Sequence, residues 1–392
     1  MNPNRKRLTL ALSLMGGMLF ISSIFALHGA LLTSIIRHFH LESSAQGLPS
    51  SLAFAGSCAA LVMSFAVIGR VSRPTMLKCA SGACAAMLAI LSFAPTFATY
   101  LIAWLLVGVA LGFMDTLLSS TMATLYSGKM ATRMMCTMHM LYGVGSMLFP
   151  PAYAFLMRSG IAWNRIYLFT AGLGALICLA FTVFARGAGE ILPKNEPEFS
   201  FPLLKTLLKN GVLPLLMIAN FCNGVFMGGA TTWLNRYVEL RFDVSLGDLA
   251  LSFLFLGVLA SRLLLPMTPI DPKNYLIGAG PLAFIAFLFV ILIPSRIVTC
   301  VGISLAGLIL GAMIPCMLDF GCSTFPENTL MITTPMFLAY YIGQTLGSPA
   351  VGFLESHISL AFGVGTCAAF LVVNSFFCLL AARRQRNQQY IK

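Results

Sequence analysis

Apolar residues in this chain gather into twelve long runs, and short polar segments separate each run from the next. Each run approaches the roughly 20 residues that an α-helix needs to cross the hydrocarbon core of a bilayer. The pattern predicts an all-α membrane protein with twelve transmembrane helices. The expected spans cover residues 8–36, 48–68, 76–93, 100–126, 134–157, 166–184, 212–240, 249–267, 275–293, 297–320, 330–353 and 358–382.

A polar stretch over residues 186–210 divides these spans into six and six. It holds Pro193, Pro197 and Pro202 among charges of both signs, and residues 203–208 are expected to form a short surface helix. We therefore predict a six-helix bundle over 1–186, a linker over 187–210 and a second six-helix bundle over 211–392. Two such halves are typical of a duplicated transporter whose substrate site lies at the midplane between them.

Composition and charge narrow the class of protein. Hydrophobic residues make up 58% of the 392 residues and charged residues only 9%, whereas about a quarter of a soluble domain is charged. The net charge of +12 does not indicate a nucleic-acid partner, because the basic residues lie between apolar runs and form no patch. With the N-terminus inside, 18 of the 24 basic residues fall in inner segments. The positive-inside rule then predicts that both termini are cytoplasmic.

Motifs for enzymatic chemistry are missing from the sequence. It contains no P-loop, no Ser–His–Asp pattern and no paired carboxylates typical of hydrolases, and its eleven cysteines have no metal-binding spacing. We expect no enzyme activity, no cofactor and no metal site.

One acid lies deep inside an apolar run. Asp115 follows about 15 residues after the start of the span near Tyr100, and an ionisable group at that depth costs roughly 2.5 to 3.5 kcal/mol and commonly marks function. We interpret Asp115 as a proton-coupling carboxylate. His139 in the next span falls within about 5 Å of the same depth and is expected to relay a proton or hold the acid ionised. The structural alternatives are a hydrogen bond to a neighbouring span for Asp115 and to a backbone carbonyl for His139.

The seventh and eleventh predicted spans carry side chains that suit a hydroxylated solute. Asn220 and Asn223 supply both donors and acceptors, and the indole of Trp233 suits the apolar side of a sugar ring. The alternative for Trp233 is an interfacial anchor. Tyr340 and Gln344 are expected to face the same cavity.

Glycines in these two spans favour two different interpretations. Gly224, Gly228 and Gly229 are expected to loosen the seventh span for gating. Gly343 and Gly347, four residues apart in the eleventh span, are typical of a small-residue face for close helix packing.

Four stretches carry a family resemblance: residues 25–29 (FALHG), 112–119 (GFMDTLLS), 232–237 (TWLNRY) and 342–344 (IGQ). They resemble the major facilitator superfamily and, within it, the fucose permease-like branch of sugar:proton symporters. That branch carries a second carboxylate in the first span, where this chain has Gly29 with His28 beside it. Its asparagine four residues after the fourth-span acid is replaced by Ser119. The resemblance implies that His28 and Ser119 line the substrate site, with simple packing as the alternative for His28.

Together these features predict a transporter of the bacterial cytoplasmic (inner) membrane, acting as a monomer. Its partners would be a small polar solute (a sugar or sugar-like compound), protons and the lipid bilayer. A proton-driven exporter of amphipathic compounds is the first alternative, because the 22 methionines and 11% aromatic residues would form an adaptable apolar cavity. A transport-silent membrane sensor is the second. The absent first-span acid leaves open whether protons are coupled at all.

Overall fold

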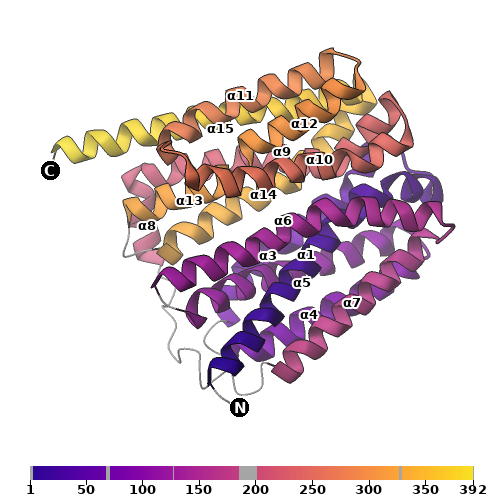
Figure 1. The fold of residues 1–392 in the computed structure, drawn as a ribbon, viewed down its shortest axis with the longest axis horizontal. Helices are drawn as coiled ribbons and strands as arrows, with labels where there is room; N and C mark the ends of the chain where they lie inside the picture. The colour runs from indigo at the N-terminus through magenta and orange to yellow at the C-terminus, as the bar shows by residue number, and fades with distance from the viewer. Residues whose placement is uncertain (1–2, 68–70, 127, 185–200, 326–328, 392) are drawn as a thin grey trace. The chain divides into compact units, whose positions relative to one another are not determined.

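The computed structural model describes residues 3–67, 71–126, 128–184, 201–325 and 329–391, and these residues are almost entirely α-helical (Figure 1). Among them, ten helical segments are long and apolar enough to cross a membrane. A shorter apolar helix over Leu48–Ser64 and the 29-residue helix α14 (Thr329–His357) complete the twelve expected spans. The all-α, twelve-helix prediction is confirmed. The predicted linker over 187–210 lies outside the described residues up to position 200, and the rest of it forms α8 (Phe201–Asn210).

The chain divides into two compact units, each described here by itself. Unit 1 comprises Met1–Leu41 and Leu52–Glu198, and unit 2 comprises Glu42–Ser51 and Phe199–Lys392. The helices of unit 1 are α1 (Pro3–Phe39), α3 (Leu48–Val67, whose first turn belongs to unit 2), α4 (Arg73–Ser92), α5 (Phe97–Leu125), α6 (Gly128–Arg158) and α7 (Trp163–Phe184). Those of unit 2 are α2 (Ser43–Gln46), α8, α9 (Val212–Arg241), α10 (Val244–Leu264), α11 (Pro272–Leu292), α12 (Arg296–Leu310), α13 (Met313–Thr324), α14 and α15 (Leu360–Ile391), with a 3₁₀ turn over Leu265–Met267.

Glycines let the helices of unit 1 approach one another closely. A side chain at Gly108 of α5 would collide with the backbone of Ala53 in α3, and one at Gly145 of α6 would collide with Ser22 of α1. Between these contacts the core is filled by buried apolar side chains, and one buried polar pair joins α5 to α7 through the Tyr100 and Tyr167 hydroxyls, 2.7 Å apart. Small residues therefore set the helix spacing on which the positions of polar side chains depend.

The same device joins α9 to α14 in unit 2. A Cβ at Gly224 would collide with the Tyr340 carbonyl oxygen, and a Cβ at Gly343 would collide with that of Phe221. The packing face predicted for the eleventh span is confirmed. The missing side chain of Gly224 makes room for the backbone of α14. The gating role expected of the α9 glycines stays a prediction.

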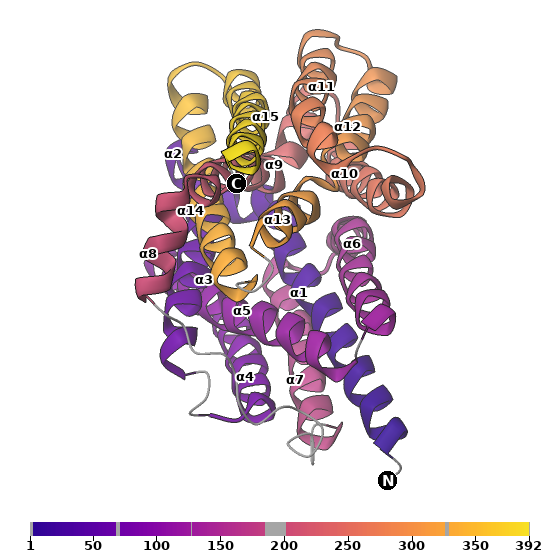
Figure 2. The same cartoon turned by 90° about the vertical axis from the view of Figure 1, so that its left-hand side faces the viewer.

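The tenth predicted span is broken into α12 and α13 at Gly311–Ala312 (Figure 2). Pro315 has no N–H to donate to the Gly311 carbonyl, and the Arg262 Nε donates to that carbonyl instead, at 3.1 Å. The Tyr275 hydroxyl donates to the Ile309 carbonyl and accepts from the Ala312 N–H. Side chains of α10 and α11 thus satisfy the backbone groups that the break leaves open.

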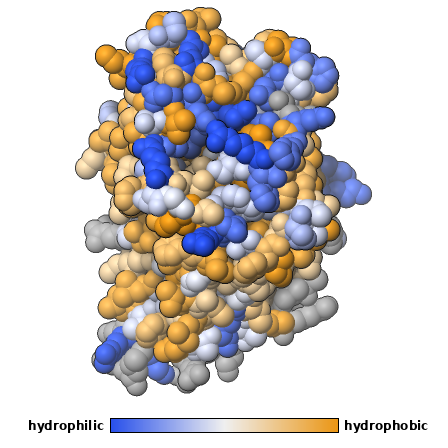
Figure 3. Space-filling view, turned by 90° about the vertical axis from the view of Figure 1, so that its right-hand side faces the viewer, coloured by the Kyte–Doolittle hydropathy of each residue, from blue (hydrophilic) through white to orange (hydrophobic). Residues whose placement is uncertain are grey.

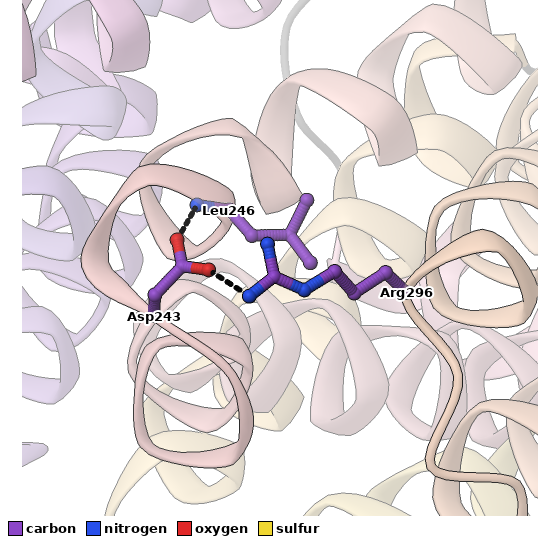
Figure 4. A network of polar contacts seen from close by, with 3 residues as sticks. All are labelled: Asp243, Leu246 and Arg296. Carbon is purple, nitrogen blue, oxygen red and sulfur yellow. Dashed lines mark hydrogen bonds and ion pairs between the residues drawn. The ribbon is translucent and has the colours of Figure 1, made fainter.

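The first turn of α10 is held by Asp243. Its Oδ1 accepts from the Leu246 N–H at 3.0 Å, and its Oδ2 lies 2.8 Å from an Arg296 guanidinium nitrogen at the start of α12 (Figure 4). Both side chains are partly exposed, with fractions of 66% for Arg296 and 35% for Asp243. Exposed ion pairs contribute little, so the helix cap is the larger of the two effects.

Replacing Asp243 separates the cap from the ion pair. Asp243→Asn keeps a capping oxygen and loses only the charge, so it should lower the free energy of unfolding by no more than about 0.5 kcal/mol. Asp243→Ala removes both and should cost about 1 kcal/mol. Thermal unfolding of the two purified variants measures the difference. Equal losses of unfolding free energy in the two variants would mean that the ion pair, and not the helix cap, stabilises the first turn of α10.

Candidate functional site

Asp115 lies on a polar stripe of α5. The helix begins with a capping box in which Thr96 and Thr99 accept each other's backbone N–H groups, at 3.3 and 3.2 Å. Asp115 and Ser119, four residues apart, share one helix face and are half-buried, whereas Met114 is fully buried. The structure therefore brings the candidate acid and the candidate substrate residue Ser119 onto the same face.

His139 of α6 is also half-buried, and the contacts of neighbouring glycines with α1 and α5 give an estimate of its depth. Gly145 lies against Ser22 of α1, and Gly17 of α1 lies against Leu118 of α5. Ser22 lies five residues beyond Gly17 on α1, His139 lies six residues before Gly145, and Asp115 lies three before Leu118. At 1.5 Å per residue these offsets put His139 and Asp115 at levels about 6 Å apart, close to one helical turn. The depth argument made from the sequence therefore agrees with the helix packing of unit 1.

His28 occupies a different level of unit 1. It is 3% exposed, and its ring packs edge-on against Trp104 of α5, with centroids 5.9 Å apart. Trp104 precedes Asp115 by eleven residues, about 16 Å along the helix axis. The structure thus separates His28 from Asp115 and places it beside an aromatic cluster that includes Tyr100 and Tyr167. Trp104 was not among the sequence-based candidates, although its spacing of four residues from Tyr100 was a readable signal.

In unit 2 the polar candidates of α9 and α14 flank the close contact between these helices. Asn220 and Asn223 are both 2% exposed and Gln344 is 6% exposed. The Asn220 amide donates to the Leu216 carbonyl at 3.3 Å within its own helix. The Asn223 Oδ1 and the Gln344 Oε1 are buried and accept no hydrogen bond from the described residues. Tyr340, four residues before Gln344, is half-buried.

Trp233 is fully buried in the same unit. Its indole N–H donates to the Ser348 carbonyl of α14 at 2.9 Å, and the Ser348 hydroxyl donates to the Gly47 carbonyl at 3.1 Å. The N–H of Trp233 is thus occupied by a contact between helices, and its fully buried ring is not accessible to a solute in this structure.

The helix ends of unit 2 that lie opposite α8 carry charges of both signs. The basic residues there are Arg236, Arg241 and Arg296, and the acidic residues are Glu239, Asp243, Asp248 and Glu355. Figure 3 looks onto this side of the molecule and shows hydrophilic residues gathered there. Within the described ranges, no group of three or more His, Cys, Asp or Glu residues is placed to hold a metal ion.

Comparison with known proteins identifies the family. A model described as the Major Facilitator Superfamily matches residues 13–348. The chain belongs to the major facilitator superfamily. The superfamily predicted from the sequence is confirmed, and the protein is an integral, multi-pass membrane protein. Its place in the fucose permease-like branch stays a prediction.

Curated relatives and solved structures extend this comparison. Protein TsgA of Salmonella heidelberg (strain SL476) is 24% identical over 252 residues, which is 63% of this chain and 61% of that protein. Protein TsgA of Escherichia coli O157:H7 is 23% identical over 251 residues, with the same coverage. The alignments therefore span less than two thirds of these relatives.

Two solved structures share the fold. A bacterial homolog of the human lysosomal transporter Spinster, inward-facing and unoccupied, superimposes with a TM-score of 0.75 at 16% identity, covering 99% of this chain and 98% of that one. A D-xylose-proton symporter gives a TM-score of 0.75 at 14% identity, covering 95% and 96%. At these identities the likeness establishes the major facilitator fold alone.

Proposed function

We propose that this transporter moves a small polar solute, a sugar or sugar-like compound, by alternating access coupled to protons. The observation that carries the proposal is the pair of buried amide oxygens on α9 and α14, Asn223 Oδ1 and Gln344 Oε1, which lack a hydrogen-bond partner among the described residues. A buried acceptor without a partner costs free energy, and the hydroxyl groups of a sugar would supply the missing donors. The D-xylose-proton symporter among the structures of like fold is consistent with such a substrate.

Proton coupling rests on unit 1. In the proposed mechanism, Asp115 takes up a proton from one side of the membrane and releases it to the other, and His139 of α6, at a similar depth, relays that proton or holds the acid ionised. A charged carboxylate in a low-dielectric span is costly, so the charge of Asp115 biases which conformation is favoured. Ser119, on the same face of α5, would contact the solute or the water that carries the proton.

The charge distribution of unit 2 supports an orientation. At the end where α8 meets α9 and α15, the basic residues are Lys205, Lys209, Arg262, Lys273, Arg383, Arg384 and Arg386, and the described acids are Asp271 and Asp319. The opposite end carries the mixed charges described above. By the positive-inside rule the basic end is cytoplasmic, in a bacterial cytoplasmic membrane.

The proposal is tested with purified protein in proteoliposomes. Hexoses, deoxyhexoses and amphipathic cations are added one at a time while an external dye reports pH. Alkalinisation outside on addition of one sugar is the expected result. A response to cations alone would favour an exporter. Silence throughout, in vesicles shown to be tight and correctly loaded, would overturn the proposal.

The two amides whose oxygens lack a partner, Asn223 and Gln344, give a sharper prediction. Replacing either with leucine, as Asn223→Leu or Gln344→Leu, should raise the KM for the sugar by up to about tenfold, because one neutral hydrogen bond to the solute is lost. Asn274→Leu, an exposed amide of α11, is the matched control and should leave the KM unchanged. Saturable uptake with an unaltered KM in both test variants would remove these amides from the site.

A further inference from the structure

A surface cleft of about 450 Å³ lies at the basic end of unit 2, apart from the polar candidates described above. Leu215 of α9 and Leu380 of α15 line its apolar part. Its polar part consists of Arg384, Asn387 and Gln388, all on the extension of α15. One wall is therefore apolar and the other carries a cation and two amides. This is the division of chemistry found in a phospholipid at the junction of its headgroup and acyl chains.

The cleft continues the face of α15 that is exposed on its apolar length. Val373 is 41% exposed and Phe376 is 54% exposed. Steps of three or four residues lead from them to Leu380, Arg384 and Asn387, so all five share one helix face. On α9, Leu215 has the exposed Ile218 three residues further along. An acyl chain lying along this apolar face would lead directly to the guanidinium of Arg384.

Hydrogen bonds hold the cleft in place at the junction between α8 and α9. The Asn210 carbonyl accepts from Arg384 Nε at 2.8 Å and from Gln388 Nε2 at 3.0 Å, and the Asn210 amide donates to Gln388 Oε1 at 3.1 Å. Gly211 follows with a positive φ of 88°, which favours glycine. These bonds fix Arg384 through its Nε and leave its two terminal nitrogens available.

The charge around the cleft is not neutralised by the described part of the chain. No described carboxylate lies within ion-pair distance of Arg384. The same is true of the neighbouring basic residues Lys205, Lys209, Arg383 and Arg386. Short basic clusters beside a membrane attract anionic lipids. An anionic headgroup complements this charge, and an acyl chain complements Leu215 and Leu380.

We propose that this cleft binds an anionic phospholipid, with the headgroup phosphate on Arg384, Asn387 and Gln388 and an acyl chain against Leu215 and Leu380. The bound lipid would bridge α9 and α15 at the end of unit 2 from which α8 emerges. The inference does not depend on the proposed substrate or on proton coupling.

Native mass spectrometry of delipidated protein, titrated with phosphatidylglycerol or phosphatidylcholine, tests the proposal. Phosphatidylglycerol should bind at least about tenfold more tightly than phosphatidylcholine, a preference that Arg384→Gln should abolish. Asn387→Asp leaves the Arg384–Asn210 bond in place, places a negative charge in the cleft, and should produce the same loss. Arg386→Gln removes a charge from the same helix outside the cleft and should keep the preference.

Three outcomes would overturn the proposal. The first is equal binding of both lipids to the native protein. The second is an equal loss of preference in Arg386→Gln, because it would point to diffuse surface charge. The third is competition by inorganic phosphate at concentrations comparable to the lipid, because it would assign the cleft to a free anion. Thermal unfolding of Asn387→Asp verifies that its fold is retained.

Discussion

Asp115→Asn is expected to abolish accumulation of the solute driven by a pH gradient. The amide has nearly the shape of the carboxyl group but cannot gain or lose a proton, so the half-buried side chain in α5 no longer changes charge during the cycle. With one proton moved per solute molecule, a gradient of about one pH unit supports about tenfold accumulation in the native protein. The variant should equilibrate the solute without concentrating it. Uptake into proteoliposomes with an acidic exterior measures this ratio.

A counterflow assay distinguishes the loss of proton coupling from the loss of transport itself. Vesicles preloaded with unlabelled solute should still exchange it for labelled solute through Asp115→Asn, because exchange needs binding and conformational change but no net proton movement. Asp271→Asn is the matched control: Asp271 caps α11 in an exposed position, and asparagine caps equally well. Undiminished accumulation in Asp115→Asn would remove Asp115 from the coupling mechanism.

Gly343→Ala is expected to lower the stability of the protein strongly. The added methyl group would collide with the Phe221 carbonyl oxygen, and a helix backbone cannot rotate away as a flexible side chain can. The α9–α14 pair must then separate, with losses of packing along both helices. The cost should reach about 3 kcal/mol, the upper part of the range for overpacked interiors. Thermal unfolding in detergent measures the change in melting temperature.

Gly278→Ala is the matched control, because it makes the same substitution inside α11 of the same unit. Nothing lies within 4 Å of the methyl group that it adds. Alanine is the better helix former by up to about 1 kcal/mol, so this variant should be as stable as the native protein or slightly more so. If both variants melted together, the contact between α9 and α14 would be looser than the structure shows.

Apolar run length was enough to place the spans along the chain. A bilayer requires about 20 apolar residues whatever their order, so length and composition carry the signal without detailed packing. The break at Gly311–Ala312 was not predicted from run length, because its cause lies in other helices. Tyr275 and Arg262 supply the hydrogen bonds that stabilise the open backbone groups at the break. Pro315 was the local sign of it.

The depth of a residue in the membrane could also be predicted from the sequence, whereas the direction in which its side chain points could not. Counting residues placed Asp115 and His139 at one level, and the contacts of α1 agree. The same counting could not show that the N–H of Trp233 bonds to Ser348, or that His28 lies against Trp104. These facts depend on helix rotation, which interhelical contacts set and apolar periodicity leaves open in spans that are apolar on all sides.

The packing of residues 42–51 has a consequence for how this chain can be divided. The chain leaves unit 1 after Leu41, contributes Glu42–Ser51 to unit 2, and returns at Leu52. There Gly47 accepts a hydrogen bond from Ser348, and Ser51 donates to the Thr345 carbonyl. A single cut in the linker therefore does not separate the units. A chimaera that exchanged the first six spans for those of another member of the superfamily would also replace residues 42–51, which belong to unit 2.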